Sequence, residues 1–276
     1  MNTNIRALQV ACDQLGLSYE FTHKTKNVLS VFIGSERYIF ANWATPLNTH
    51  AMSVVCRDKD FLYSLYEDVI NMPQTQSFLD PNTEEKYEQY LDESSYDSII
   101  ETIEKDFSYP MIIKKNRGSF GRNVFKVDDH ASLLRAVSTI FDHESSYYDY
   151  ILIAQDYIEP QTEYRAIFLD GVLQFVYEKN IDEATFVGNL SPLHWENAKA
   201  IEIKDTVLLE RIESFARPMF AKKMVDYCGL DIILDTHGEL WMIEMNASPG
   251  YDHFVSDSGD TTVVALYQKI LQRLQA

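Results

Sequence analysis

The segment from Gly229 to Gly250 restricts the fold more than any other part of the sequence. Two apolar runs flank a polar turn at residues 236–238, a pattern that predicts a β-hairpin. Asp231 lies near the start of the first run, and Glu244 and Asn246 lie two positions apart in the second. A strand therefore directs the last two side chains to the same face. Two carboxylates and an amide oxygen beside a Pro-Gly turn form a site suited to Mg²⁺, with Mn²⁺ as an alternative.

A second segment, residues 109–127, combines an apolar strand that ends at two lysines with a glycine-rich turn and another strand. Lys114 is the first of these lysines, and the turn contains Gly118, Ser119 and Gly121. Glycines let backbone N–H groups approach an anion, and lysines neutralise it. In a Walker A loop the lysine instead follows the last glycine, and a helix comes next. The segment therefore predicts a phosphate-binding hairpin of a different kind.

The composition bounds the size and the surroundings of the protein. With 276 residues, 46% of them hydrophobic and 24% charged, the chain is typical of a globular protein of one or two domains. Its formal charge of −18 would repel nucleic acid and anionic membranes, so we expect neither as a partner. The N-terminus lacks a secretory pattern, and no apolar run reaches the roughly 18 residues of a membrane span. Three widely spaced cysteines without a CxxC motif fit a reducing compartment, so we expect a cytoplasmic protein.

Apolar periodicity predicts alternating helices and strands with antiparallel hairpins, which indicates an α+β or mixed α/β fold. Residues 1–57 are predicted to form a first small unit that begins with a helix and continues with a hairpin. Helices are expected over residues 82–91 and 204–227. The polar stretch 180–203 is predicted to be an irregular connection, and a loop of that length is usually a functional lid.

The order of these features resembles the ATP-grasp superfamily. The phosphate-binding hairpin comes first, a strand ending at Gln155 to Glu159 follows, and the hairpin with Gly-x-Asp and Glu-x-Asn-x-Ser-Pro-Gly comes last. Over about residues 58–250 the chain is similar to D-alanine–D-alanine ligases, glutathione synthetases and ribosomal-protein glutamate ligases. The residues before this range resemble the lead-in to the ATP-grasp domain of cyanophycin synthetases.

The resemblance implies an α+β ATP-grasp fold, in which two α+β subdomains clasp ATP. It divides the chain into a short N-terminal lead-in subdomain, 1–57, and an ATP-grasp domain, 58–276. Within the second, a lid-type subdomain is expected at about residues 108–158 and the metal-binding hairpin at 229–250.

The resemblance also implies roles for the nucleotide-binding residues. Lys59 and Lys114 match the two phosphate-binding lysines, and Gln155 matches a position, often an acid, that contacts the adenine amino group. The backbone of Tyr157 and Ile158 would bind the edges of the adenine ring. The ribose-binding acid matches Glu163, with Glu159 as a second candidate.

Further roles concern the transferred phosphoryl group. Arg165 matches a position where an arginine meets phosphate or acyl-phosphate, although a strand salt bridge to Glu178 is the alternative. Asn189 resembles the asparagine of a Ser-Asn-Leu loop in the glutamate ligases, whereas Lys179 is expected to be a solvated or counter-ion residue. The magnesium ligands match Asp231, Glu244 and Asn246.

These roles imply an ATP-dependent carboxylate–amine ligase that acts through an acyl-phosphate and releases ADP and phosphate. Its partners would be a small-molecule or peptide carboxylate and an amine or amino acid, with ATP and Mg²⁺ as cofactors and a homodimer as one option. Two alternatives remain open: an ATP-grasp kinase that phosphorylates a small-molecule hydroxyl, and a non-catalytic ATP-binding module.

Overall fold

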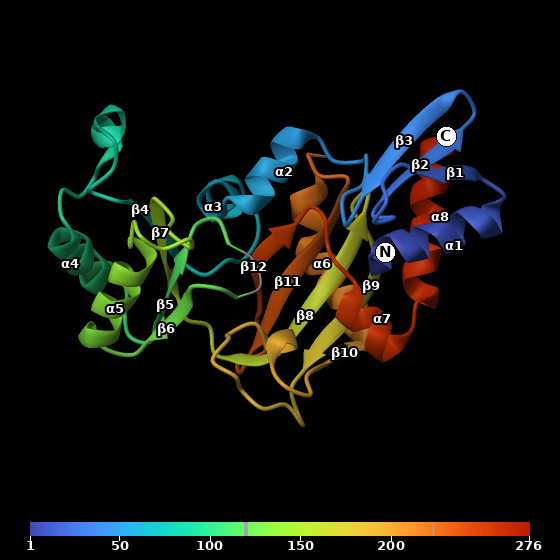
Figure 1. The fold of residues 1–276 in the computed structure, drawn as a ribbon. Helices are drawn as coiled ribbons and strands as arrows, with labels where there is room; N and C mark the ends of the chain where they lie inside the picture. The colour runs from blue at the N-terminus through green and yellow to red at the C-terminus, as the bar shows by residue number, and fades with distance from the viewer. Residues whose placement is uncertain (119–120, 223) are drawn as a thin grey trace.

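The computed structural model describes residues 1–118, 121–222 and 224–276. These residues form three sheets, and Figure 1 shows the two larger ones side by side, with the N-terminal sheet at one end of the molecule. The paired strands of this described part are antiparallel throughout. Antiparallel sheets covered by helices confirm the predicted α+β class. None of the helices in these ranges is long and apolar enough to cross a lipid bilayer.

The four-stranded sheet at the left of Figure 1 has the order β4-β7-β5-β6. Its strands are β4 (Thr75–Leu79), β5 (Met111–Lys115), β6 (Val124–Val127) and β7 (Ile151–Asp156). Two helices, α4 (Tyr96–Asp106) and α5 (His130–Ile140), share a buried core with these strands. The predicted helix 82–91 is instead a short 3₁₀ helix, η1 (Glu85–Tyr90), which has no buried residue and therefore no packing to stabilise a longer α-helix.

The five-stranded sheet at the centre has the order β10-β9-β8-β11-β12. Its strands are β8 (Pro160–Leu169), β9 (Val172–Asn180), β10 (Lys199–Glu202), β11 (Tyr227–Asp235) and β12 (Leu240–Asn246). The helices α2 (His50–Arg57), α3 (Lys59–Tyr66) and α6 (Thr206–Ala216) pack in one core with Tyr164, Ala166 and Phe168 of β8. Since side chains alternate along a strand, Glu163 and Arg165 lie on the opposite face, where the cleft forms.

The predicted helix over residues 204–227 is wrong in its second half. α6 ends at Ala216, the 3₁₀ helix η3 (Arg217–Phe220) follows, and β11 already begins at Tyr227. Pro218 has no backbone N–H to continue an α-helix, which accounts for the early end. The stretch 180–203 is also more regular than predicted, because it contains β10 and the 3₁₀ helix η2 (Pro192–His194).

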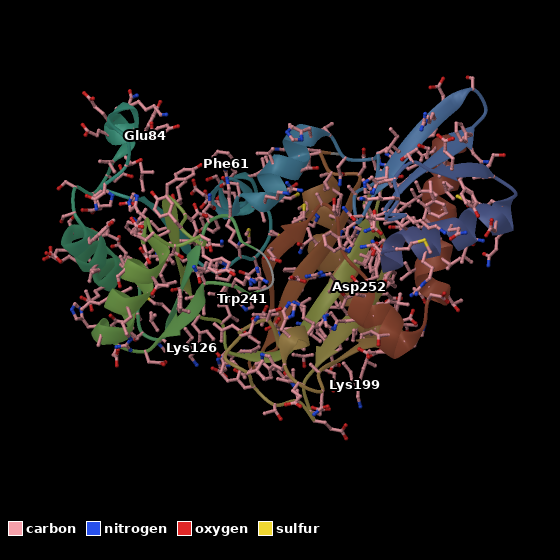
Figure 2. All side chains as sticks on the ribbon, viewed as in Figure 1. Phe61, Glu84, Lys126, Lys199, Trp241 and Asp252 are labelled. Atoms are coloured by element: carbon pink, nitrogen blue, oxygen red, sulfur yellow. The ribbon has the colours of Figure 1, made fainter. Side chains whose placement is uncertain are left out.

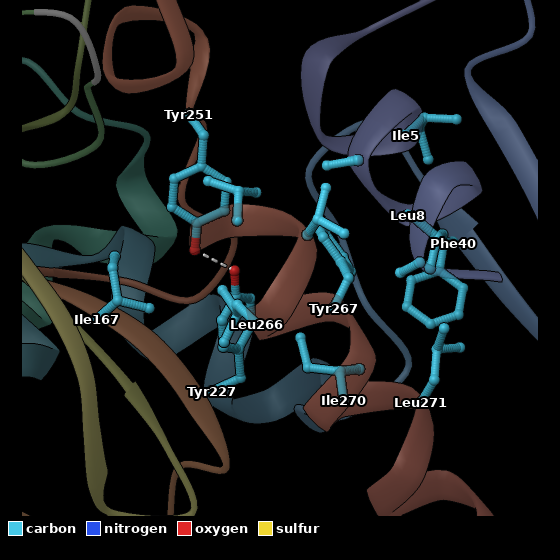
Figure 3. Packing of buried hydrophobic residues seen from close by; sticks show 14 of the residues in the cluster. Ile5, Leu8, Phe40, Ile167, Tyr227, Tyr251, Leu266, Tyr267, Ile270 and Leu271 are labelled. Carbon is cyan, nitrogen blue, oxygen red and sulfur yellow. Dashed lines mark hydrogen bonds between the residues drawn. The ribbon is translucent and has the colours of Figure 1, made fainter. Parts of the chain in front are cut away.

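The N-terminal segment shares a core with the C-terminal helices. It consists of α1 (Thr3–Leu15) and a sheet of β1 (Ser18–Phe21), β2 (Val28–Ile33) and β3 (Glu36–Ala41). The C-terminal helices are α7 (Asp252–Ser258) and α8 (Thr261–Gln275). Figure 3 shows Leu8 of α1 and Phe40 of β3 packed with Ile270 and Leu271 of α8. The predicted division of the chain at residue 57 remains a prediction.

Candidate active site

One row of side chains crosses the central sheet. Tyr177 pairs with Arg165, Arg165 with Asp231, and Asp231 with Glu244, so the row spans β9, β8, β11 and β12. The predicted hairpin is therefore present, with Asp231 opposite Glu244 and Gly229 opposite Asn246. Antiparallel pairing places side chains on one face within contact distance of each other. The sheet thus brings together residues that are far apart in the sequence.

Arg165 and Asp231 form a bidentate ion pair. Arg165 Nε lies 2.5 Å from Asp231 Oδ1, and Arg165 Nη2 lies 2.6 Å from Asp231 Oδ2. Burial alone would lower the pKa of Arg165 and raise that of Asp231, but their mutual attraction reverses both shifts. Both groups are therefore charged at neutral pH. The alternative pairing of Arg165 with Glu178 is wrong, because Glu178 is paired with Tyr164 across the strands and bonds Asn180.

Lys179 joins the same charge cluster as a counter-ion, which is one of the two roles predicted from the sequence, whereas the other, a solvated residue, is wrong. Its side chain is buried, and its Nζ lies 3.3 Å from Glu163 Oε2 and 3.3 Å from Asp231 Oδ1. Burial lowers the pKa of Lys179, but the two carboxylates outweigh burial and raise it overall. Burial raises the pKa of Glu163, and Lys179 limits the rise. Arg165 and Lys179 thus face three carboxylates here, those of Glu163, Asp231 and Glu244.

The predicted metal ligands present oxygen atoms from adjacent strands. Asn246 Nδ2 donates a hydrogen bond of 3.1 Å to Glu244 Oε1, so the amide oxygen of Asn246 is the atom left to coordinate a cation. Across the described ranges, no three His, Cys, Asp or Glu side chains gather into a metal cluster, so the predicted set needs this amide as its third member. Two carboxylates and an amide oxygen suit a hard divalent cation. The donor chemistry therefore fits Mg²⁺.

The four-stranded sheet presents Lys114 to the cleft with a neutral partner. Lys114 Nζ donates to Gln155 Oε1 at 2.8 Å, and Gln155 Nε2 donates to Thr75 Oγ1 at 2.7 Å. Thr75 Oγ1 in turn donates to the carbonyl of Pro73 at 2.9 Å, so the direction of all three bonds is fixed. Burial, and then the charge of Lys59, lower the pKa of Lys114 to about 7. Lys114 thus lacks the carboxylate contact that Lys179 has.

Lys59 and the glycine-rich turn lie beside Lys114. Lys59 begins α3, and its Nζ donates to the carbonyl oxygens of Asn116 and Gly118, at 3.2 Å each. Gly121 has a positive φ of 66°, and a Cβ built there would overlap Asn189 Oδ1, so the turn approaches Asn189 closely. Ser119, also predicted to bind phosphate, lies outside the described residues.

A cleft of about 1170 Å³ joins the two sheets. Figure 2 labels one lining residue from each side, Lys126 on β6 and Asp252 on α7. Tyr157, Ile158 and Glu163 line the cleft, whereas the second ribose candidate, Glu159, is exposed and is absent from its lining in the described part of the chain. The predicted site residues that line the cleft are Lys59, Lys114, Gly118, Gly121, Gln155, Tyr157, Ile158, Glu163, Arg165, Asp231, Glu244 and Asn246.

Comparison with protein-family models matches residues 85–272 to the RimK-like ATP-grasp domain. The chain belongs to the RimK-like ATP-grasp family. The predicted superfamily and fold are confirmed. A search of curated protein sequences gave no significant match.

Solved structures share the RimK-like ATP-grasp fold at low sequence identity. A D-alanine–D-alanine ligase from Bacillus anthracis is 19% identical, with a TM-score of 0.56 over 82% of this chain and 68% of that one. The ATP-grasp ligase PsnB, complexed with its precursor peptide and AMPPNP, is 16% identical, with a TM-score of 0.53 over 82% and 61%. A bifunctional glutathione synthetase from Pasteurella multocida is 14% identical, with a TM-score of 0.60 over 99% and 44%. At these identities the likeness shows the fold alone.

Sequence reasoning about this RimK-like ATP-grasp chain missed Thr75, and it named Lys179 without placing it in the site. Lys179 follows Tyr177 by two positions on β9, so it lies on the same face as the row through Arg165. A strand extended to Asn180 would have revealed it. Thr75 carries no such signal, because its bond to Gln155 joins β4 to β7 across 80 positions of the sequence.

Proposed function

We propose that this enzyme joins a carboxylate to an amine through an acyl-phosphate, forms an amide or peptide bond, and releases ADP and phosphate. The observation that supports this most is the row Arg165, Asp231 and Glu244, which lies in the same cleft as Lys114. Cations on both sides of a cleft, with carboxylates and an amide on one side, suit a polyphosphate and its divalent cation. The substrates would be a small-molecule or peptide carboxylate and an amine or amino acid.

The nucleotide would lie between the two sheets. Lys59 and Lys114 would bind its phosphates together with the backbone N–H groups of Gly118 and Gly121. Gln155 and the backbone of Tyr157 and Ile158 would bind adenine. The ribose hydroxyls would bond Glu163, with Glu159 as the second candidate.

Asp231, Glu244 and Asn246 would hold Mg²⁺ or Mn²⁺. The bound ion would neutralise phosphate oxygens. Asp231 also orients Arg165 through its bidentate ion pair, so one carboxylate links the proposed metal site to the arginine.

In the first step a carboxylate oxygen of the substrate attacks the γ-phosphorus of ATP. The bond from that phosphorus to the bridging oxygen breaks, and ADP leaves with the electron pair. Arg165 and Lys179 neutralise charge on the transferred group, and positioning accounts for most of the catalysis. Asn189, which contacts the glycine turn, would hold the acyl-phosphate and help exclude water.

In the second step the amine nitrogen attacks the acyl carbon. The bond from carbon to the phosphate oxygen breaks, phosphate leaves with the electron pair, and the nitrogen loses a proton to give the amide. Neither step uses a nucleophile from the protein.

The test is a phosphate-release screen with Mg-ATP and paired amino acids and short peptides. Release should require a carboxylate and an amine together, and mass spectrometry should find the amide. Glu244→Gln should reduce turnover by at least about a thousandfold, since it removes one charge from the proposed metal set. Glu239→Gln, on the turn of the same hairpin, is the matched control and should keep full activity.

Three outcomes would contradict the proposal. Full activity of Glu244→Gln would refute the metal assignment. A stable phosphorylated product without an amide would favour the hydroxyl kinase. ATP binding without turnover over the whole panel would favour the non-catalytic module.

A further inference from the structure

An apolar wall borders the cleft beside the proposed phosphoryl-transfer site. It consists of Trp43, Ile181, Phe186 and Trp195, and all four line the cleft. Three of these side chains are unusually open to solvent: Trp43 is 38%, Ile181 40% and Phe186 54% exposed. Large apolar side chains exposed beside a cleft mark a binding surface more often than isolated ones do.

Contacts position three members of this apolar wall, which are Trp43, Phe186 and Trp195. A Cβ built on Gly250 would lie 3.0 Å from Trp43 Nε1, so the indole covers the segment that follows the proposed metal-binding strand. Three residues further on, the ring of His253 meets that of His194 edge to face, with centroids 5.8 Å apart. Next to His194, the ring of Trp195 meets Phe186, with centroids 5.2 Å apart.

Phe186 is exposed although the loop that carries it is held by internal hydrogen bonds. Thr185 and Glu196 exchange backbone hydrogen bonds of 2.8 Å and 3.2 Å across the loop. Trp195 Nε1 also donates to the carbonyl of Asn189. The loop therefore holds Phe186 toward the cleft while its own polar groups are satisfied.

His194 directly precedes Trp195 of the apolar wall and lines the same cleft. Burial lowers the pKa of His194, and the charges of His253, Lys179 and Arg122 lower it further. His194 is thus neutral at pH 7 and near enough to Lys179 to sense its charge. An amine that must lose a proton during attack meets a weak base there rather than a second cation.

We infer that the apolar wall is the binding site for the side chain of the amine substrate, and that this side chain is bulky and apolar. The inference rests on the proposed ligase function. The carboxylate substrate has to lie beside Arg165 and Lys179 to receive the phosphoryl group, so the wall remains for the amine. The wall itself carries no charged side chain that could pair with an acidic or basic group of the substrate.

Tryptophan fluorescence tests this inference without turnover. The chain has three tryptophans, and two of them, Trp43 and Trp195, belong to the apolar wall. In a Trp241→Phe background, with Mg²⁺ and a non-hydrolysable ATP analogue, the protein is titrated with leucinamide, glycinamide, lysinamide and glutamate. Leucinamide should bind at least about tenfold more tightly than the other three, because only its side chain buries apolar surface.

Two variants test whether Phe186 accounts for the tighter binding of leucinamide. Phe186→Ala should weaken leucinamide about tenfold and leave glycinamide and the ATP analogue unchanged. Phe32→Ala, an exposed phenylalanine on β2 outside the cleft lining, is the matched control and should change none of the three affinities. Equal affinity for leucinamide and glycinamide, or tighter binding of lysinamide or glutamate, would overturn the inference.

Turnover separates this inference from the proposed function. If phosphate release requires a charged or small amine, the apolar wall has another role while the ligase assignment stands. If leucinamide binds tightly but no pair of substrates releases phosphate, the binding site stands and the ligase assignment fails.

Discussion

Lys114 and Lys179 lie in the same cleft and are almost equally buried, with exposures of 4% and 7%, yet their environments differ. Lys179 contacts two carboxylates, and their charges raise its pKa despite burial. Lys114 bonds the neutral amide of Gln155, and burial lowers its pKa to about 7. Lys179 thus has carboxylate partners within the protein. Lys114 gains an anionic partner when an anion such as a nucleotide phosphate arrives.

Replacing the shared carboxylate should have the largest effect. Asp231→Asn leaves Arg165 and Lys179 buried without their common partner, and breaking a buried pair in this way costs about 3–5 kcal/mol. Urea denaturation at pH 7 measures the loss. Asp226→Asn, which removes a half-exposed partner of Arg273, is the control and should cost less than about 1 kcal/mol. If both variants lost the same free energy of unfolding, the buried charge cluster would contribute no more to stability than the half-exposed pair of Asp226 and Arg273.

Removing each lysine should shift stability in opposite directions. Lys179→Met leaves Glu163 buried without its cation and should destabilise the fold by about 2 kcal/mol. Lys114→Met removes a charge that burial disfavours, so the free energy of unfolding should stay constant or rise by about 1–2 kcal/mol at pH 7. The same urea titration compares the two variants. Destabilisation of similar size in both would refute the contrast between the lysines.

The free energy of unfolding should depend on pH because the pKa of Lys114 is lowered in the folded state. Its pKa of about 7 in the folded state lies below the unfolded value of about 10.4, so between these values the unfolded chain binds more protons. Stability therefore rises with pH in this window, by at most about 1.4 kcal/mol per pH unit, and the full cost is present below about pH 7. The stability advantage of Lys114→Met over the wild type should shrink as pH rises from about 7 to about 9.5.

The variant Gln155→Glu tests whether Lys114 causes this pH dependence of stability. A carboxylate beside Lys114 should raise the pKa of the lysine and bring it close to the situation of Lys179. The slope of stability against pH between about 7 and 9 should then flatten relative to the wild type. An unchanged slope would mean that another group causes it.

Gly121→Ala should give the smallest change in stability and tests the contact between the two sides. The positive φ of Gly121 costs alanine about 1 kcal/mol, and the added Cβ would also push against Asn189. Gly34→Ala is the matched control, because its φ is also positive, at 59°, but nothing lies within 4 Å of its Cβ. Gly121→Ala should lose at least as much stability as Gly34→Ala, and only Gly121→Ala should lower turnover. Equal turnover would show that the contact with Asn189 is dispensable.

Local patterns in the sequence were sufficient for much of the fold. The hairpin that carries Asp231 and Glu244 and the N-terminal helix α1 follow from apolar periodicity, which the structure confirms. The long helix over residues 204–227 failed because Pro218 outweighs the helical spacing around it.

The charge partners could not be predicted in the same way. The sequence identifies Arg165 and Lys179 as cations. It does not show that both pair with Asp231, because that pairing depends on the register of three strands. The contact of Trp43 with Gly250 joins a turn near the N-terminus to a segment more than two hundred residues later. Such pairings arise only when the sheets assemble, so no local sequence pattern predicts them.

The packing of α1 against α8 has a consequence for biosynthesis. The apolar face of α1, with Ile5 and Leu8, is synthesised more than 250 residues before its partners Ile270 and Leu271 of α8. Until α8 is made, this face lacks part of its native core and is open to other chains in the crowded cell. We therefore expect nascent chains stalled before α8 to bind chaperones, and emergence of α8 to end that dependence.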